Sequence, residues 1–263
     1  MIKMFVTDID GTLTLPGQKV PQKNIEAVQA MVAAGVKVII ATGRMHCAAL
    51  PIAAQLGVSI PIIAYNGAVI KSSSGEMIHA KYLDEDKALA LINFFEERDW
   101  YLQGYSDDVL YIPQRDDNAK FYERILNVKG VEVGWDGLRG LKNVPKLLSV
   151  APTAEETDAR LSAVEKKFGG QIEITRSAPV FCEFMSPGIS KASAIKILAD
   201  KFGIANEEIL AIGDSDNDLQ MILSAGCGVA MGNAVQTVKD AAPHITDTCE
   251  NCGFAKAVYD FVL

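Results

Sequence analysis

The sequence contains no run of 18 or more apolar residues, so we expect no membrane-spanning helix. It also has no low-complexity tract and no internal repeat, which argues against fibrous and solenoid proteins. Basic residues are in deficit: 25 Lys and Arg stand against 33 Asp and Glu, and the net charge of −8 disfavours duplex DNA and anionic membranes as partners. A small anionic ligand remains compatible with this charge, because a metal ion or a local basic site can outweigh it.

Cysteine is sparse, and nothing at the start of the chain resembles a signal peptide. The apolar stretch that begins at Met1 is interrupted by Asp8, too early for the apolar core of such a peptide. The five cysteines are Cys47, Cys182, Cys227, Cys249 and Cys252. An odd number without a secretory signal predicts reduced thiols and a cytoplasmic protein.

The composition is that of a globular protein, and the first part of the chain alternates strands with helices. Hydrophobic residues make up 49% of the chain, enough for a sizeable core in one large domain or two modest ones. We expect buried strands at Ile2–Thr7, Val36–Ala41 and Ile60–Tyr65, with helices at about 24–34 and 48–56. Strands that alternate with helices in this way predict an α/β fold with a parallel sheet.

The pattern changes in the middle of the chain and then resumes. A β-hairpin is expected around Ser72–Gly75, followed by helices and short strands mixed in an α+β pattern. From a helix at Lys191–Phe202 onward, strands and helices alternate again. We therefore expect a parallel α/β core formed by residues 1–82 and 181–263, interrupted by an inserted α+β domain at 83–180.

Two aspartates, Asp8 and Asp10, follow the first expected strand in the stretch DIDGT. Ligands bind beyond the carboxyl ends of the strands in open α/β sheets. Two carboxylates this close repel each other unless one is protonated or a cation lies between them. Mg²⁺ with oxygen ligands is the usual cation beside phosphate. The alternative is a solvated turn, and this stretch alone does not separate the two.

A second acidic cluster, GDSDND, follows the strand expected at Ile209–Ile212. N-capping of the next helix needs one of these polar residues rather than four. The excess favours Asp214 as a metal ligand, with Asp218 as either a ligand or a residue that positions one.

Two further stretches occupy equivalent places in the pattern. In ATGR, Thr42, Gly43 and Arg44 follow the second strand and offer a hydroxyl, a close-approaching backbone and a cation. Lys191 opens a helix, where its charge opposes the helix dipole unless an anion is bound there. An ordinary loop and an incidental lysine are the alternatives.

Together, the stretches DIDGT, ATGR, ISK and GDSDND resemble the four motifs of the haloacid dehalogenase superfamily of phosphatases, in order and in spacing. The resemblance spans the whole chain and implies a Rossmann-like core. An α+β insertion of this length between the second and third motifs resembles the cap of the Cof-type (IIB) branch. One departure is Ala192 after Lys191, where many relatives have glycine.

The resemblance implies that Asp8 is a nucleophile that forms an aspartyl-phosphate, and that Asp10 is the general acid and base. It implies that Mg²⁺ is bound by the Asp8 side chain, the Asp10 backbone carbonyl and Asp214. Asp218 would orient Lys191 or a metal-bound water.

The resemblance also implies which residues bind substrate. Thr42 and Lys191 would bind the phosphoryl oxygens, with the Gly43 backbone close by, and Asn217 would touch the same group. Arg44 would contact the substrate or the cap, or would instead fix its loop by a salt bridge.

The expected function is a Mg²⁺-dependent phosphatase for small phosphorylated metabolites, with sugar phosphates foremost. A sugar phosphomutase of the phosphomannomutase type is the alternative, but it needs an arginine-rich second phosphate site. The arginines of the insertion are scattered: Arg98, Arg115, Arg124, Arg139, Arg160 and Arg176. A non-catalytic phosphate-binding protein is a third alternative, disfavoured because both Asp8 and Asp10 are present.

Other reactive residues do not form a site in the sequence. Cys249 and Cys252 form a single CxxC without a second pair or a suitably spaced pair of histidines, so a structural role is expected. The three histidines are isolated from one another, and the mechanism above needs none of them.

Overall fold

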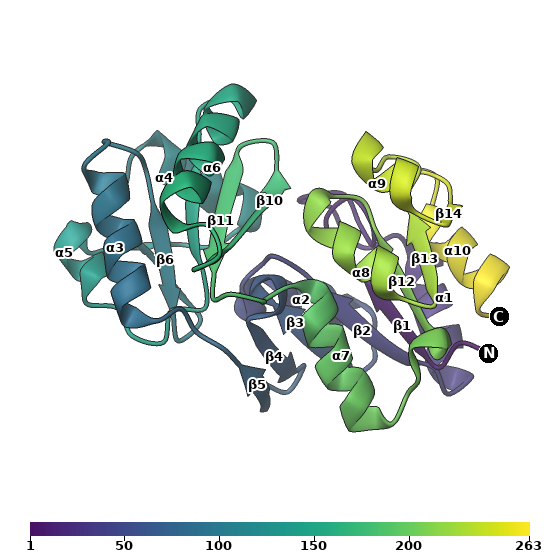
Figure 1. Cartoon of the computed structure of the whole chain (residues 1–263). Helices are drawn as coiled ribbons and strands as arrows, with labels where there is room; N and C mark the ends of the chain where they lie inside the picture. Colours follow the sequence, from purple (N-terminus) through teal and green to yellow (C-terminus); the bar gives the residue numbers. More distant parts are fainter. The chain divides into compact units, whose positions relative to one another are not determined.

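The computed structural model describes all 263 residues and divides into two compact units (Figure 1). The first unit comprises Met1–His79 and Ser190–Leu263, and the second Ala80–Ile189. The second junction lies later in the chain than the sequence indicates. The reason is strand β11 (Phe181–Met185), which pairs with strands of the second unit rather than with the first sheet.

The first unit is built on a sheet with the order β14-β13-β12-β1-β2-β3-β4-β5. Its strands are β1 (Met4–Thr7), β2 (Lys37–Ala41), β3 (Pro61–Ala64), β4 (Val69–Ser72), β5 (Met77–Ala80), β12 (Ile209–Gly213), β13 (Cys227–Ala230) and β14 (His244–Ile245). From β14 to β3 all neighbours are parallel, and β4 runs antiparallel to β3. This agrees with the expected parallel core, because the central strands are apolar runs buried on both faces.

Helices cover both faces of this sheet. They are α1 (Gln22–Ala33), α2 (His46–Gln55), α7 (Lys191–Phe202), α8 (Leu219–Ser224), α9 (Gln236–Ala241) and α10 (Gly253–Phe261). α1 packs with α10, and α7 packs with α8 (Figure 1). The chain leaves β1 toward β2 but leaves β12 toward β13, in the opposite direction along the sheet. A crevice is expected where such neighbouring connections diverge, at the carboxyl ends of β1 and β12.

The second unit is an α+β domain with a six-stranded sheet of order β10-β11-β9-β6-β7-β8. Its other strands are β6 (Gln103–Ser106), β7 (Val109–Ile112), β8 (Val131–Glu132), β9 (Leu147–Val150) and β10 (Glu173–Ala178), and its helices are α3 (Glu85–Glu96), α4 (Asp117–Leu126), α5 (Gly134–Arg139) and α6 (Ala154–Phe168). A buried cluster that includes Phe95, Leu147, Phe168 and Phe184 forms its core. The unit therefore has a hydrophobic core of its own.

In this unit the sequence predicts helices at 84–97 and 154–168 and strands at 100–105, 109–112, 146–150 and 172–175. It does not predict four elements that the structure has: α4, β8, α5 and β11. β8 has two residues and α5 six, too short for a period to be recognised. β11 follows β10 across a turn that contains Pro179, a residue that interrupts a strand pattern. None of the helices in either unit is both long and apolar enough to span a lipid bilayer.

A buried polar network lies within the second sheet. Lys146 and Glu183 form an ion pair of 3.0 Å with side chains 1% and 2% exposed. The Tyr105 hydroxyl donates to that of Tyr122 at 2.6 Å and accepts from the Gln103 amide at 2.6 Å. Burial raises the pKa of the Tyr105 hydroxyl well above its ordinary value, so this tyrosine is neutral.

Replacing Lys146 with methionine is expected to lower the free energy of unfolding by about 3–5 kcal/mol. The change leaves the Glu183 carboxylate buried without its ammonium partner. Urea denaturation measures the effect, and the double variant Lys146→Met/Glu183→Leu should recover most of it.

The matched control is Lys256→Met. Lys256 pairs with Asp260 at 2.6 Å, but these side chains are 55% and 46% exposed. An exposed pair contributes about 0–1 kcal/mol. Equal losses in the two lysine variants would contradict the stabilising role of the buried pair.

Candidate active site

The loops after β1 and β12 meet where the connections diverge. The register pairs Thr7 with Ile212, so Asp8 and the residues after Gly213 emerge side by side. One carboxylate oxygen from each of Asp8, Asp214 and Asp218 lies within 4.8 Å of the others. The fold thus brings together acidic residues that are about two hundred positions apart in the sequence.

Lys191 lies between two of these carboxylates. Its Nζ donates to Asp8 Oδ1 and to Asp218 Oδ1, both at 2.6 Å, and its side chain is 1% exposed. Burial lowers the pKa of the Lys191 ammonium, but the Asp218 and Asp8 carboxylates outweigh burial and hold the pKa above its ordinary value. Protein carboxylates therefore supply the negative charge that the sequence analysis attributed to a bound anion.

Lys191 is placed by the start of α7. Ser190 caps the helix: its side chain accepts from the Ser193 N–H, and the Ser193 hydroxyl in turn accepts from the Ser190 N–H. This reciprocal cap fixes the first turn, in which Lys191 is the first helical residue. The expected helix at Lys191–Phe202 has these same bounds in the structure.

Asp218 is fully buried, and both of its carboxylate oxygens are engaged. Oδ1 accepts from Lys191, and Oδ2 accepts from the backbone N–H groups of Asp214 and Ser215 at 2.9 and 3.0 Å. Gly213 lies so close that a Cβ there would be 2.4 Å from Asp218 Cγ. The geometry makes Asp218 an anchor of the loop and of Lys191.

Asp214 lies at the end of β12 and faces the loop after β1. Its Oδ1 accepts from the Thr12 hydroxyl at 2.8 Å, and its Oδ2 from the Ser215 hydroxyl at 3.3 Å. Burial and the neighbouring Asp218 raise the pKa of the Asp214 carboxyl to about 7. Burial also raises the pKa of Asp8 well above its ordinary value, against the effect of Lys191.

The donor set suits a divalent cation. Three carboxylates, two buried and that of Asp214 half-buried, face one ammonium, so negative charge is in excess, and a hard cation with oxygen ligands would balance it. No protein group donates a hydrogen bond to Asp8 Oδ2. No backbone N–H in the loop after β1 donates to the Asp10 carbonyl oxygen. The carboxylates of Asp8 and Asp214 and the Asp10 carbonyl oxygen are the groups that could hold the ion.

Gly11 allows the two loops to approach each other. Its φ is +85°, and a Cβ at this position would lie 2.6 Å from Asp214 Oδ2. Asn233 also holds this loop, because its amide donates to the Gly11 carbonyl at 2.9 Å. Glycine is therefore required at position 11 by the close approach to Asp214 as well as by the positive φ of the turn.

Gly11→Ala is expected to weaken divalent-metal binding by at least about 10-fold, because the new Cβ displaces the Asp214 carboxylate. Titration of the metal by calorimetry measures this effect. Gly17→Ala is the matched control: Gly17 has a φ of +75°, and a Cβ there meets nothing within 4 Å. If both variants bound the metal as the wild type does, the contact with Asp214 would be irrelevant to the metal.

Asp10 is held by Arg44 rather than by the acidic cluster. The Arg44 guanidinium binds the Asp10 carboxylate through two hydrogen bonds of 2.6 and 2.5 Å. The Thr42 hydroxyl accepts from the Arg44 N–H at 3.1 Å. Of the roles expected for Arg44, the salt bridge is the one that this geometry favours, and it forms with Asp10 itself.

Asn217 points toward Asn66, a residue that the sequence analysis did not place in the site. Its Nδ2 donates to Asn66 Oδ1 at 2.9 Å, and Gly43 lies against the same Asn66 oxygen. Thr12, Asn66 and Asn233 are therefore site residues that sequence reasoning missed. Thr12 is the last residue of the DIDGT motif, so the sequence could have indicated it. Asn66 and Asn233 look like ordinary turn-forming residues, and nothing local indicates their contacts with Asn217 and Gly11.

Cys249 lies close to the site, because its thiol contacts the loop after β1. Cys249 is buried and its thiol donates to the Thr12 carbonyl at 3.5 Å, in agreement with the expected structural role. Burial raises the pKa of Cys249 to about 12, so it is an unreactive thiol.

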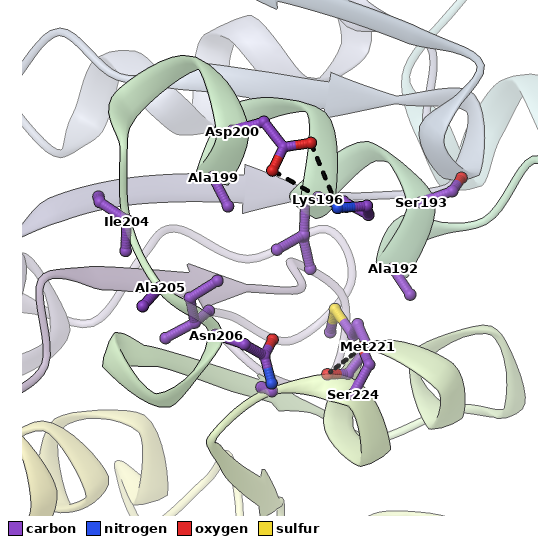
Figure 2. A pocket seen from close by; sticks show the side chains of 13 residues that line it. Ala192, Ser193, Lys196, Ala199, Asp200, Ile204, Ala205, Asn206, Met221 and Ser224 are labelled. Carbon is purple, nitrogen blue, oxygen red and sulfur yellow. Dashed lines mark hydrogen bonds and ion pairs between the residues drawn. The ribbon is translucent and has the colours of Figure 1, made fainter.

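A cavity of about 590 Å³ lies between α7, α8 and the loop before β12 (Figure 2). α7 presents Lys196 and Asp200 to this cavity, but presents Lys191 to the acidic cluster.

Comparison with known proteins identifies the family. A family model described as haloacid dehalogenase-like hydrolase matches residues 5–258. The chain is 31% identical to the 5-amino-6-(5-phospho-D-ribitylamino)uracil phosphatase YcsE of Bacillus subtilis, over all of this chain and 96% of the relative. It is 28% identical to the phosphatase YwpJ of the same organism, over 97% of this chain and 98% of the relative.

Solved structures agree. A haloacid dehalogenase-like hydrolase from Bacteroides thetaiotaomicron superposes with a TM-score of 0.87 at 30% identity, over 99% of each chain. The subclass IIB sugar phosphatase BT4131 superposes with a TM-score of 0.85 at 28% identity, over 98% of each chain.

The protein belongs to the haloacid dehalogenase-like hydrolases, and its relatives place it among their phosphatases. It is therefore an enzyme that acts on phosphate esters. The resemblance and the α/β fold class expected from the sequence are both confirmed. Enzymes of this family use a divalent metal ion, for which the buried carboxylates of this chain provide a fitting site.

Proposed function

We propose that the protein hydrolyses small phosphomonoesters with Mg²⁺ as its metal, and that Asp8 is the nucleophile. The observation that carries this proposal is the position of Asp8. It is a buried carboxylate bonded to Lys191 and adjacent to Asp214, at the point where the sheet's connections diverge. One oxygen of Asp8 is held by Lys191, and the other is left to attack phosphorus.

Mg²⁺ would be held by the Asp8 carboxylate, the Asp10 backbone carbonyl and the Asp214 carboxylate. We assign Asp218 to positioning rather than to the metal, because both of its oxygens are engaged. Mg²⁺ is the hard, oxygen-preferring cation usual beside phosphate groups. When bound, it neutralises charge on the phosphoryl oxygens and on Asp8.

The reaction would proceed in two steps. Asp8 Oδ2 attacks the phosphorus while the bond to the ester oxygen breaks, and Asp10 protonates that oxygen as the alcohol leaves. Asp10 then accepts a proton from water, whose oxygen attacks the aspartyl-phosphate and releases inorganic phosphate and the Asp8 carboxylate. Arg44 holds both oxygens of the ionised Asp10 carboxylate, so Asp10 would leave this salt bridge to carry the proton to the ester oxygen.

The transferred phosphoryl group would be bound by four residues of the first unit. Lys191 supplies positive charge, and the Thr42 hydroxyl, which accepts from Arg44, keeps its own hydrogen to donate. The Gly43 N–H and the Asn217 amide would complete the contacts. Fixed donors around an oxygen that gains charge in the transition state provide much of the catalysis.

The substrates that we propose are phosphate esters of small polyhydroxylated molecules, sugar phosphates in particular. The named relatives support this class, since one acts on a phosphorylated ribityl compound and a structural neighbour is a sugar phosphatase. The acidic net charge supports a metabolite rather than a nucleic acid. We infer a cytoplasmic enzyme, because all five cysteines are free thiols, which a reducing compartment favours.

The arginines of the second unit support a hydrolase over a mutase. A mutase needs arginines available for a second phosphate, whereas these make ion pairs or stack within their own unit. The pairs are Arg115–Glu123, Arg139–Glu96, Arg160–Glu156 and Arg176–Asp158, while Arg98 stacks on Phe94 and Arg124 on Phe121.

The proposal is tested by a screen of hexose, pentose, polyol and nucleotide monophosphates with Mg²⁺, in which released phosphate and isomerised sugar phosphate are measured in parallel. We expect phosphate release, with the highest kcat/KM on a sugar or polyol phosphate. Isomerisation without release would establish the mutase, and inertness toward every ester would refute the proposal.

A further inference from the structure

Three consecutive residues, Tyr65, Asn66 and Gly67, adopt positive φ angles of 51°, 55° and 112°. They form a short turn directly after β3, and the tyrosine and the asparagine are each only 2% exposed. Residues other than glycine rarely adopt this left-handed backbone, and they keep it only where the surroundings impose it. The hydrogen bonds and packing around the turn must therefore impose this conformation.

The backbone of the turn is bonded to both sides of the ATGR loop. The Tyr65 N–H donates to the Arg44 carbonyl at 2.9 Å, and the Asn66 N–H donates to the Thr42 carbonyl at 3.0 Å. Gly43, which lies between these two residues, approaches so closely that a Cβ on it would be 2.9 Å from Asn66 Oδ1. The turn thus sets the position of the loop that carries Thr42.

The same turn contacts the two other loops of the site. Asn66 Oδ1 accepts from Asn217 Nδ2 at 2.9 Å across 151 residues of sequence. A Cβ on Gly67 would be 2.3 Å from the Ser190 carbonyl oxygen, so Gly67 lies directly against the residue that caps α7. α7 begins with Lys191, so three segments that reach the acidic site meet on this one turn.

We propose that the turn Tyr65–Gly67 sets the relative positions of the three loops that bind the phosphoryl group, and that Asn66 is a positioning residue for Asn217. This inference rests on the proposed function. The Asn217 amide has two hydrogens: Asn66 accepts one of them and thereby directs the other toward the phosphoryl oxygen. Asn66 itself does not touch the substrate in this arrangement.

The residue type at position 66 supports this assignment. Glycine would adopt the left-handed backbone at no steric cost and would keep the hydrogen bond to Thr42, because that bond comes from the backbone. An asparagine adds the side-chain acceptor for Asn217. The alternative, that Asn66 is only a tolerated turn residue, makes a different prediction for the glycine variant.

Asn66→Gly separates the two roles. It preserves the backbone of the turn and removes the acceptor, so we expect a Tm within about 3 °C of the wild type. We expect kcat/KM for a sugar phosphate to fall on the order of 10- to 100-fold, the scale of a small misplacement of a binding group. The dissociation constant of inorganic phosphate, measured by calorimetry with Mg²⁺, should rise in parallel.

Asn127→Gly is the matched control. Asn127 is exposed at the end of α4 and has a φ of 51°, so it shares the backbone conformation but has no part in the site. It should show wild-type kcat/KM and phosphate binding. This comparison removes the general effect of placing glycine in a left-handed position.

A double-mutant cycle with Asn217→Ala tests the route of the effect. If Asn66 acts through Asn217, adding Asn66→Gly to Asn217→Ala should change kcat/KM less than about 3-fold, although it is costly alone. Independent, multiplying losses would overturn the positioning role, and so would full activity in Asn66→Gly beside an active wild type. A wild-type protein that neither hydrolyses phosphomonoesters nor binds phosphate would instead overturn the proposed function, and this inference with it.

Discussion

Replacing Asp8 with asparagine should abolish phosphate release, with kcat reduced by roughly 10⁴-fold or more, the scale of losing a catalytic nucleophile. The amide keeps the size of the side chain, and its oxygen can still accept from Lys191. Burial already opposes the charged form of Asp8, so a neutral group there should cost little stability. Phosphate release by the purified variant measures the activity, and circular dichroism with thermal unfolding checks the fold.

Asp10→Asn is the informative companion to this variant. With p-nitrophenyl phosphate, whose leaving group needs little protonation, the first step should proceed while hydrolysis of the aspartyl-phosphate lacks its base. With a labelled phosphoryl group on the substrate, acid quenching should therefore trap phosphorylated protein in Asp10→Asn and none in Asp8→Asn. The label should lie on the peptide that contains Asp8. Label on another residue, or activity in Asp8→Asn, would eliminate Asp8 as the nucleophile.

The second large effect concerns the metal. Chelation should abolish activity, and Mg²⁺ should restore it. In Asp214→Asn the Mg²⁺ concentration needed for half-maximal activity should rise at least about 10²-fold. That is the upper end of the loss seen when a residue that only supports a metal ligand is removed. The amide oxygen can still accept from Thr12, so the loop should keep its shape.

Asp216→Asn is the control for Asp214→Asn. Asp216 belongs to the same acidic stretch, but it is exposed and accepts from the Thr237 hydroxyl at 2.8 Å. Its Mg²⁺ requirement should equal that of the wild type. Bound Mg²⁺ should also stabilise the wild type by about 2.7 kcal/mol at one hundred times its dissociation constant. Stabilisation that survives in Asp214→Asn would place the ion elsewhere.

The sequence predicts the core of this protein well because local signals and long-range topology agree there. Apolar strands and acidic residues at the carboxyl ends of strands each have a recognisable pattern. Parallel order then brings the loops after β1 and β12 to one edge without further information. The family motifs add the identities of the residues at that edge.

The remainder depends on contacts that leave no local signal. Asn66 looks like any turn-forming asparagine, and its bond to Asn217 spans 151 residues. The local sequence attributes a bound anion to Lys191 and does not pair it with Asp8, because no spacing rule connects the two residues. Only the family resemblance relates Asp218 to Lys191. In the second unit, α5 and β8 are too short for periodicity, and β11 follows a proline turn.

The arrangement of strands also has a consequence for how the chain folds during synthesis. Thr12 and Asp214 are 202 residues apart, so a nascent chain cannot form its metal site until almost all of it has left the ribosome. The inserted unit shortens the loop that must close afterwards, because its two ends are joined: Lys81 Nζ donates to the Pro187 carbonyl at 2.6 Å. Once this unit folds, it removes about half of the loop that must close between β1 and β12, which lowers the entropic cost by about 0.6 kcal/mol.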